Sequence, residues 1–117
     1  MISKDAVLHY HFSWNTKCFY KVLVGDIGLR LKELIKETCA TYGMTIIRGN
    51  IRPNSVNIFI RAPNDLSPAK IMQYIKGRAA HSLFKEFPEL KKRYWGCHLW
   101  ERGYYCRPVE PVCDEVV

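Results

Sequence analysis

Apolar and polar residues alternate along the stretch from Arg52 to Pro63, which is rich in β-branched and aromatic side chains. Prolines stand near both of its ends, so the pattern predicts a central strand that begins at a turn and stops sharply. Because side chains alternate between the two faces of a strand, one face is expected to be apolar and the other polar. The apolar set is Val56, Ile58 and Ile60, and the polar pair is Ser55 and Asn57.

Three further stretches are expected to be strands. Residues Ala6 to Trp14 alternate well enough for a first strand, and Met44 to Ile51 for a second, with Gly49-Asn50 as a kink or bulge. The second strand is expected to pair with the central one as a hairpin. The last strand is placed at about His98 to Pro108.

Two segments instead repeat apolar residues at helical spacing. The first helix is expected from Val24 to about Thr41, with Asp26 as its cap and Gly43 as its stop. Its apolar residues are Ile27, Leu29, Leu31, Leu34, Ile35 and Cys39, with Tyr42 as a further candidate.

The second helix has a clear start signal in Ser67-Pro68. Its apolar positions are Ile71, Met72, Ile75 and Ala79. Gly77 within it costs helix stability and suggests that something approaches closely there. Leu83 to Lys92 is expected to form a further short helical piece, broken by Pro88. The order strand, helix, strand, strand, helix, strand predicts an α+β, ferredoxin-like antiparallel sheet with helices on one face.

Composition bounds the class of protein. The 117 residues, 48% of them hydrophobic, are enough for one folded domain over residues 1–117. A net charge of +7 and a pI of about 9.3 favour an anionic partner, with nucleic acid as the leading candidate. There is no membrane-spanning run or signal peptide, and five scattered cysteines fit a reducing compartment, so a cytoplasmic location is expected.

Two groups of residues raise the question of metal binding. His9-Tyr10-His11 places two imidazoles on one face of the first strand, where they either bind a metal or face solvent or the core. Cys97, His98, Cys106 and Cys113 crowd the last third but lack the spacings of a zinc knuckle. Solvated or buried side chains are the preferred interpretation in both cases.

Aromatic side chains are dense near the end of the chain, at Tyr94, Trp95, Trp100, Tyr104 and Tyr105. In a basic protein such residues stack on unpaired bases, but more often they belong to the core or to a dimer interface. Trp95 and Trp100 are expected in the core, and the place of Tyr105 is left open.

Several motifs together resemble one family in a single register. They are Tyr10-His11, Thr16-Lys17, the central strand, Lys76-Gly77-Arg78, the run from Phe84 to Gly96, His98-Leu99-Trp100 and Arg102-Gly103-Tyr104. The chain resembles the small TnpA-type transposases, the IS200-like single-strand DNA transposases of the tyrosine HUH class. The resemblance implies a homodimer that binds hairpin or single-stranded DNA, with a divalent metal (magnesium or manganese) held by two histidines and a nucleophilic tyrosine on a C-terminal helix.

The chain departs from that pattern at the catalytic positions. Ser55 and Asn57 occupy the two positions where the family carries metal-binding histidines, and a hydroxyl and an amide are weaker ligands than imidazole. Val112 to Val117 is expected to be the opening turn of the catalytic helix, with the tyrosine placed beyond Val117. Tyr104 and Tyr105 match the last strand, so no catalytic residue, metal ligand or bound cofactor is assigned.

The resulting hypothesis is a DNA-binding transposase relative with impaired catalysis. Its candidate nucleic-acid contacts are Lys17, Arg52, Lys76, Arg78 and Arg102. The alternative is a non-catalytic binding module or regulator that recognises single-stranded DNA or RNA.

Overall fold

The computed structural model describes residues 7–93 and 98–110, and all structural statements below refer to these residues. Its elements in chain order are β1 (Val7–Asn15), the 3-10 helix η1 (Lys17–Phe19), α1 (Gly25–Thr41), β2 (Thr45–Arg52), β3 (Ser55–Pro63), α2 (Pro68–Glu86), α3 (Glu89–Arg93) and β4 (Tyr105–Pro108).

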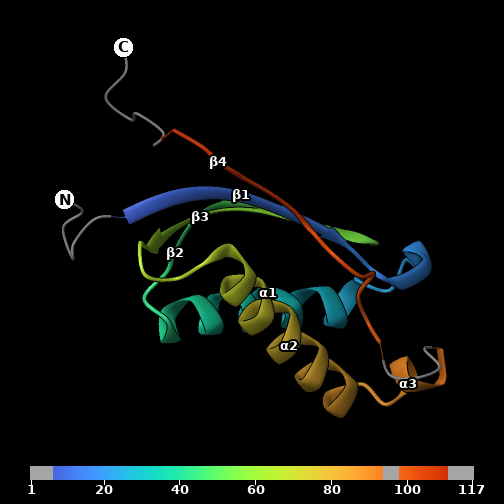
Figure 1. Ribbon diagram of the computed structural model, residues 1–117. Helices are drawn as coiled ribbons and strands as arrows, with labels where there is room; N and C mark the ends of the chain where they lie inside the picture. Colours follow the sequence, from blue (N-terminus) through green and yellow to red (C-terminus); the bar gives the residue numbers. More distant parts are fainter. Residues whose placement is uncertain (1–6, 94–97, 111–117) are drawn as a thin grey trace.

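The strands form one antiparallel sheet in the order β2-β3-β1-β4. The predicted central strand is β3, which lies between β2 and β1, although Arg52 belongs to β2 and β3 begins at Ser55. Figure 1 shows α1 and α2 together on one side of the sheet. The α+β, ferredoxin-like arrangement with helices on one face is therefore confirmed.

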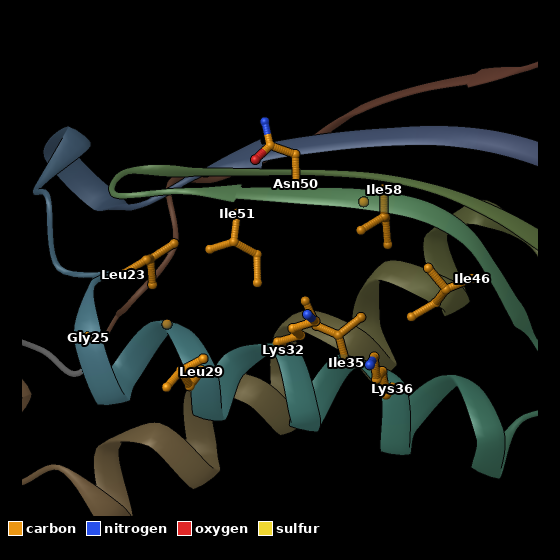
Figure 2. A pocket seen from close by; sticks show the side chains of 12 residues that line it. Leu23, Gly25, Leu29, Lys32, Ile35, Lys36, Ile46, Asn50, Ile51 and Ile58 are labelled. Carbon is orange, nitrogen blue, oxygen red and sulfur yellow. The ribbon is translucent and has the colours of Figure 1, made fainter.

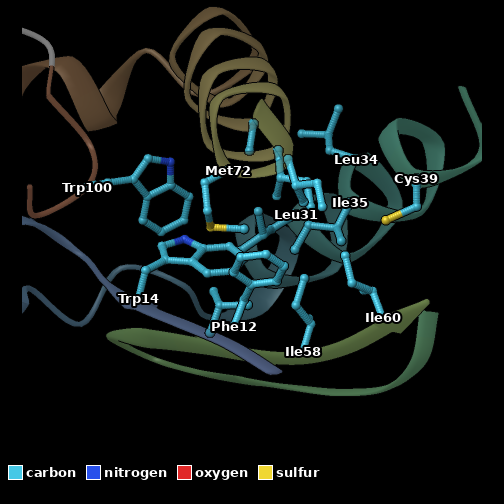
Figure 3. Packing of buried hydrophobic residues seen from close by; sticks show 14 of the residues in the cluster. Phe12, Trp14, Leu31, Leu34, Ile35, Cys39, Ile58, Ile60, Met72 and Trp100 are labelled. Carbon is cyan, nitrogen blue, oxygen red and sulfur yellow. The ribbon is translucent and has the colours of Figure 1, made fainter. Parts of the chain in front are cut away.

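The core lies between the sheet and the two long helices. Phe12 and Trp14 from β1, with Ile58 and Ile60 from β3, meet Leu31, Ile35 and Met72 from the helices (Figure 3). Trp100 packs edge-on against Trp14, with ring centroids 5.9 Å apart, so its predicted core position is confirmed. Trp95 lies outside the described residues.

The start of α1 differs from the prediction. Val24 is the N-cap residue and no side chain caps the helix, while Asp26 stands within the first turn. Asp26 is therefore not the cap, although a carboxylate in the first turn still favours the helix electrostatically. Leu29 is 65% exposed, so the apolar stripe is narrower than expected. Gly43, with φ of 72°, ends the helix as predicted.

The start of α2 is confirmed, because Ser67 Oγ accepts a hydrogen bond from the backbone N–H of Lys70 at 3.1 Å and Pro68 follows. The helix continues to Glu86, so the separate piece after the proline is only α3. A side chain at Gly77 would meet nothing within 4 Å, and within the described residues no close approach explains this glycine.

Two details of the sheet were predicted wrongly. The irregularity in β2 falls between Ile46 and Arg48, not at Gly49-Asn50. β4 is shorter than expected, and Trp100 makes only an isolated bridge to Thr16. The hairpin between β2 and β3 is confirmed.

Candidate nucleic-acid interface

The face of the sheet opposite the helices carries polar, basic and aromatic side chains. In β1 and β3 the residues that alternate with the buried ones lie on this open face, and the pairing register places their partners from β2 and β4 beside them. The polar, basic and aromatic members of this set are His9, His11, Ser13, Asn15, Thr45, Arg48, Asn50, Arg52, Ser55, Asn57, Phe59, Arg61, Tyr105 and Arg107. Ser55 and Asn57 thus share one face, as their spacing predicted.

One row of this open face crosses all four strands. His11 pairs with Phe59 on one side and with Arg107 on the other, and Phe59 pairs with Arg48. The His11 and Phe59 rings stack at 4.3 Å with an angle of 4° between their planes, and the Arg48 guanidinium lies 4.4 Å from the centre of the Phe59 ring. These contacts fix the orientation of the two rings and place an arginine at each end of the row.

Tyr105 stands beside this row. Its ring centroid is 5.5 Å from that of His11 and the planes meet at 65°, so at most one of its two ring faces is directed at the imidazole. Tyr105 is 51% exposed. Its predicted place was left open, and it lies on the open face rather than in the core.

The pattern of charge on the sheet is one-sided. None of the residues in β1 to β4 as described is an Asp or a Glu, whereas Arg48, Arg52, Arg61 and Arg107 are all exposed. The described carboxylates stand on the helices and in loops. The open face therefore favours an anion spread over several strands.

Ser55 and Asn57, the pair that the sequence analysis matched to metal-binding histidines, have side chains that fit a divalent metal ion poorly. His11 Nε2 lies 3.2 Å from Asn57 Oδ1, and because that oxygen can only accept, Nε2 donates the hydrogen bond. The amide oxygen of Asn57 therefore already accepts one hydrogen bond, and both an amide oxygen and the Ser55 hydroxyl are weaker ligands than imidazole. His9 shares the face with His11, and no group of at least three His, Cys, Asp or Glu residues gathers there among the described side chains.

A second basic feature is a cavity of about 550 Å³ between η1, α2 and the segment 98–103. Lys17, Lys76 and Arg102, three of the residues predicted to contact nucleic acid, line it together. His98 lines it as well, and Glu101 is the carboxylate among its described lining residues. Residues far apart in the sequence thus form one cationic hollow.

Hydrogen bonds hold this cavity in shape. The Lys76 ammonium donates to the backbone carbonyls of Glu101 at 3.2 Å and Gly103 at 2.9 Å, and the Trp100 indole N–H donates to the Lys76 carbonyl at 3.0 Å. The Lys17 amide donates to the Leu99 carbonyl at 2.9 Å. Burial lowers the pKa of Lys76. Lys76 therefore has two effects: it holds the loop that carries Arg102, and it adds a positive charge to the cavity.

The other two predicted contacts lie elsewhere. Arg52 is exposed at the end of β2, on the open face and opposite Ser55. Arg78 is exposed on α2 and does not line the cavity. The sequence analysis missed Arg48, Phe59, Arg61 and Arg107. The alternation of β3 was a signal for Phe59 and Arg61, whereas Arg48 reaches the open face only because β2 shifts its register.

An apolar groove of about 480 Å³ lies between α1 and β2. Figure 2 shows Leu23, Ile46, Ile51 and Ile58 projecting into it, while Asn50 projects to the other side of the sheet. Lys32 and Lys36 of α1 also line it. This groove is separated from the open face by the sheet itself.

Other predicted candidates are only partly described. Cys18, Cys39 and Cys106 are free thiols, while Cys97 and Cys113 of the proposed zinc group lie outside the described residues, as does Val112 to Val117. Within the described part of the chain, no helix is long and apolar enough to span a bilayer.

Comparison with known proteins identifies relatives along most of the chain. A family model described as "Transposase IS200 like" matches residues 5–117. The ISDra2 transposase TnpA of Deinococcus radiodurans is 30% identical over 97 residues, which are 83% of this chain and 69% of that protein. The transposase for insertion sequence element IS200 of Salmonella typhimurium is 23% identical, over 82% of this chain and 63% of its own length.

Solved structures show the same fold. A crystal structure of a Deinococcus radiodurans protein assigned as a transposase superimposes with a TM-score of 0.84 at 26% identity, covering 94% of this chain and 85% of that one. A REP-associated tyrosine transposase bound to a REP hairpin gives a TM-score of 0.67 at 12% identity over 89% of this chain and 57% of its own. The match of the family model to nearly the whole chain shows that this protein belongs to the IS200-like transposase family.

Proposed function

We propose that this protein recognises hairpin or single-stranded DNA at the ends of an insertion element, and that it retains binding while its capacity for DNA cleavage is impaired. Membership of the IS200-like family supports DNA as the partner. The hairpin in the structure of the REP-associated relative belongs to that protein, and it motivates the choice of a hairpin here. A homodimer is part of this proposal and is tested by light scattering.

The observation that carries the proposal is the convergence of Lys17, Lys76 and Arg102 on one cavity. These residues come from η1, from α2 and from the loop before β4. Because the three segments are far apart in the sequence, only tertiary contacts bring the three side chains to one cavity. Among the described residues this cavity is lined by several cations and one carboxylate, an arrangement that suits the phosphates of a folded DNA strand better than a flat basic surface does.

Impaired cleavage follows from the donor atoms at positions 55 and 57. The Asn57 amide oxygen accepts a hydrogen bond from His11, and Ser55 offers only a hydroxyl. In this family the metal would polarise the scissile phosphate, and this chain places no imidazole at either position to hold it. We therefore expect binding that does not depend on manganese.

The test measures binding of a fluorescent DNA hairpin, a duplex and an unstructured strand over a salt series, with and without manganese. The proposal expects hairpin binding to be tightest and indifferent to manganese. Lys17→Ala and Arg102→Ala should each weaken hairpin binding at least about threefold and lower the salt slope by about one unit. Lys91→Ala, which removes an exposed charge from α3, is the control and should have a smaller effect.

Two results would count against the proposal. Equal and weak binding of all three probes would mean that only the overall positive charge attracts DNA. Manganese-dependent cutting of the hairpin by the purified protein would show that the chemistry is intact and that the assignment of impaired cleavage is wrong.

A further inference from the structure

We propose that the outer edge of β2 is a docking site for an extended segment of a partner protein in which apolar and acidic residues alternate. The segment adds a strand to the sheet, and its apolar side chains cover the groove between α1 and β2. This site is separate from the cavity lined by Lys17 and Arg102, and the inference does not depend on DNA binding.

The backbone of β2 is open on its outer side. β2 is the outermost strand on its side of the sheet and pairs only with β3, and no backbone hydrogen bond from another described segment reaches it. The irregularity lies between Ile46 and Arg48, and from Arg48 to Arg52 the register with β3 is unbroken. A regular edge of this kind offers N–H and C=O groups to a further strand.

The apolar groove lies directly beside this edge. Ile46 and Ile51 of β2 project into it (Figure 2), and Gly49 between them has no side chain to fill it. A side chain at Gly49 would approach Ile58 Cγ2 to 3.1 Å, so the hollow cannot be filled from β2 without a shift of its neighbours. A strand paired with β2 directs every second side chain to the helix side of the sheet. Apolar side chains at those positions would cover the groove and leave water.

The charges around the edge favour an acidic partner. Arg48 and Arg52 of β2 are exposed on the face away from α1, and no residue of β2 is acidic. Lys32 and Lys36 line the groove on the other face, and none of its described lining residues is an Asp or a Glu. Acidic side chains that alternate with the apolar ones would therefore lie beside the two arginines, and a basic segment would be repelled from both faces.

Other occupants use these features less well. In a second copy of this chain, β2 would place its own arginines beside Arg48 and Arg52, and like charges on adjacent strands are destabilising. A nucleic-acid strand supplies negative charge but neither the amide groups that pair with a strand edge nor apolar side chains for the groove. A polypeptide of apolar and acidic residues satisfies the edge, the groove and the charge together.

The experiment measures binding of fluorescein-labelled peptides of about eight residues to the whole chain. A peptide in which valine and glutamate alternate should bind, and one with lysine in place of glutamate should bind at least about tenfold more weakly. Serine in place of valine tests the groove and should weaken binding at least about fivefold.

Backbone methylation tests the pairing itself. The amides of alternate residues point to opposite edges of a strand, so only the valine amides or only the glutamate amides can face β2. Two valine–glutamate peptides, one N-methylated at the valines and the other at the glutamates, should therefore differ in affinity at least about tenfold.

The variants Arg48→Glu and Arg107→Glu form a matched pair, because the two arginines end the same row of the sheet on opposite edge strands. Arg48→Glu should weaken binding of the valine–glutamate peptide at least about fivefold and strengthen that of the valine–lysine peptide. Arg107→Glu should leave both affinities within about twofold. Urea unfolding shows whether each variant keeps the fold, and the peptide series on the parent protein does not depend on either variant.

The outcomes separate this inference from the proposed function. Equal binding of the valine–glutamate and valine–lysine peptides, equal binding of the two N-methylated peptides, or equal effects of Arg48→Glu and Arg107→Glu would refute the docking site. A dimer that the peptide dissociates would show that a second copy occupies the edge, which also refutes it. A parent protein that binds the DNA hairpin but no peptide leaves the proposed function standing, and one that binds the peptide but no hairpin does the reverse.

Discussion

The imidazole of His11 donates a hydrogen bond to the amide oxygen of Asn57, with 3.2 Å between Nε2 and Oδ1. His11 lies on β1 and Asn57 on β3, two residues from Phe59, the direct partner of His11. The His11 ring is also stacked on Phe59, so the imidazole is held from two sides. The Asn57 amide oxygen thus accepts a hydrogen bond from within the sheet.

Restoring imidazoles should restore metal affinity. In the double variant Ser55→His with Asn57→His, both side chains point to the same open face, and we expect affinity for manganese to rise by at least about tenfold. Calorimetric titration measures this directly. Ser55→Ala with Asn57→Ala is the control and should show no gain. A double histidine variant that binds no better than the parent would show that the family register at these positions is wrong.

Two glycines should respond in opposite ways to alanine. Gly43 has φ of 72°, where a side chain is strained, so Gly43→Ala should lower the free energy of unfolding by about 1 kcal/mol. Gly77 lies within α2 and a side chain there meets nothing within 4 Å, so Gly77→Ala should raise the free energy of unfolding by about 0.5–1 kcal/mol. Urea denaturation measures both.

Gly77 also lines the cavity that contains Lys17, Lys76 and Arg102. The Gly77→Ala variant therefore also tests whether DNA binds close to the backbone there. If DNA approaches the backbone there, Gly77→Ala should stabilise the protein and weaken hairpin binding. A stabilised variant with unchanged hairpin affinity would remove the reason for expecting close approach at this position.

Burial within the sheet should decide the cost of removing an isoleucine. Ile60 is fully buried, and Ile60→Ala should lower the free energy of unfolding by about 2–5 kcal/mol. Ile47 is 40% exposed at the irregular point of β2, and Ile47→Ala should change it by only about 0.5 kcal/mol. Similar losses for both variants would contradict the placement of the irregularity.

The ion pair between Arg30 of α1 and Glu86 of α2 should lower the pKa of the Glu86 carboxyl. Arg30 Nε lies 2.7 Å from Glu86 Oε1, and this hydrogen bond holds the pKa of Glu86 below its ordinary value of 4.5. The pKa of Glu86 is lower in the folded state than in the unfolded state. The stability that the ion pair contributes is therefore fully present above the unfolded-state pKa, and it is lost as the pH falls through the folded-state pKa.

Titration of the Glu86 carboxyl by NMR tests this pair. Arg30→Met should raise the pKa of Glu86. The difference in stability between the variant and the parent should shrink below about pH 4, because protonation of Glu86 removes the ion pair from the parent as well. Lys85→Met removes a lesser, longer-range contribution and should raise that pKa less. An unchanged pKa in Arg30→Met would show that the two side chains do not pair in solution.

Much of the fold could be predicted because local patterns carry it. The alternation of Val56, Ile58 and Ile60 identifies a strand with one buried face, and Ser67-Pro68 marks a helix start through a single backbone hydrogen bond. The prediction that Asp26 caps the first helix also rested on a local pattern. It was wrong because a polar residue near a helix start need not make the capping hydrogen bond. The polar face with Ser55 and Asn57 followed directly from the period of the strand.

The sequence by itself determined which residues are basic and which strands have a buried face, and it carries the proposal that Ser55 and Asn57 replace the family's two metal-binding histidines. Tertiary structure alone decided that Lys17, Lys76 and Arg102 meet, because loop contacts between distant segments bring them together. It also placed Arg48 against Phe59: the register shift after Ile46 reverses the faces of β2, and a shift of one residue depends on pairing with β3 rather than on neighbouring residues.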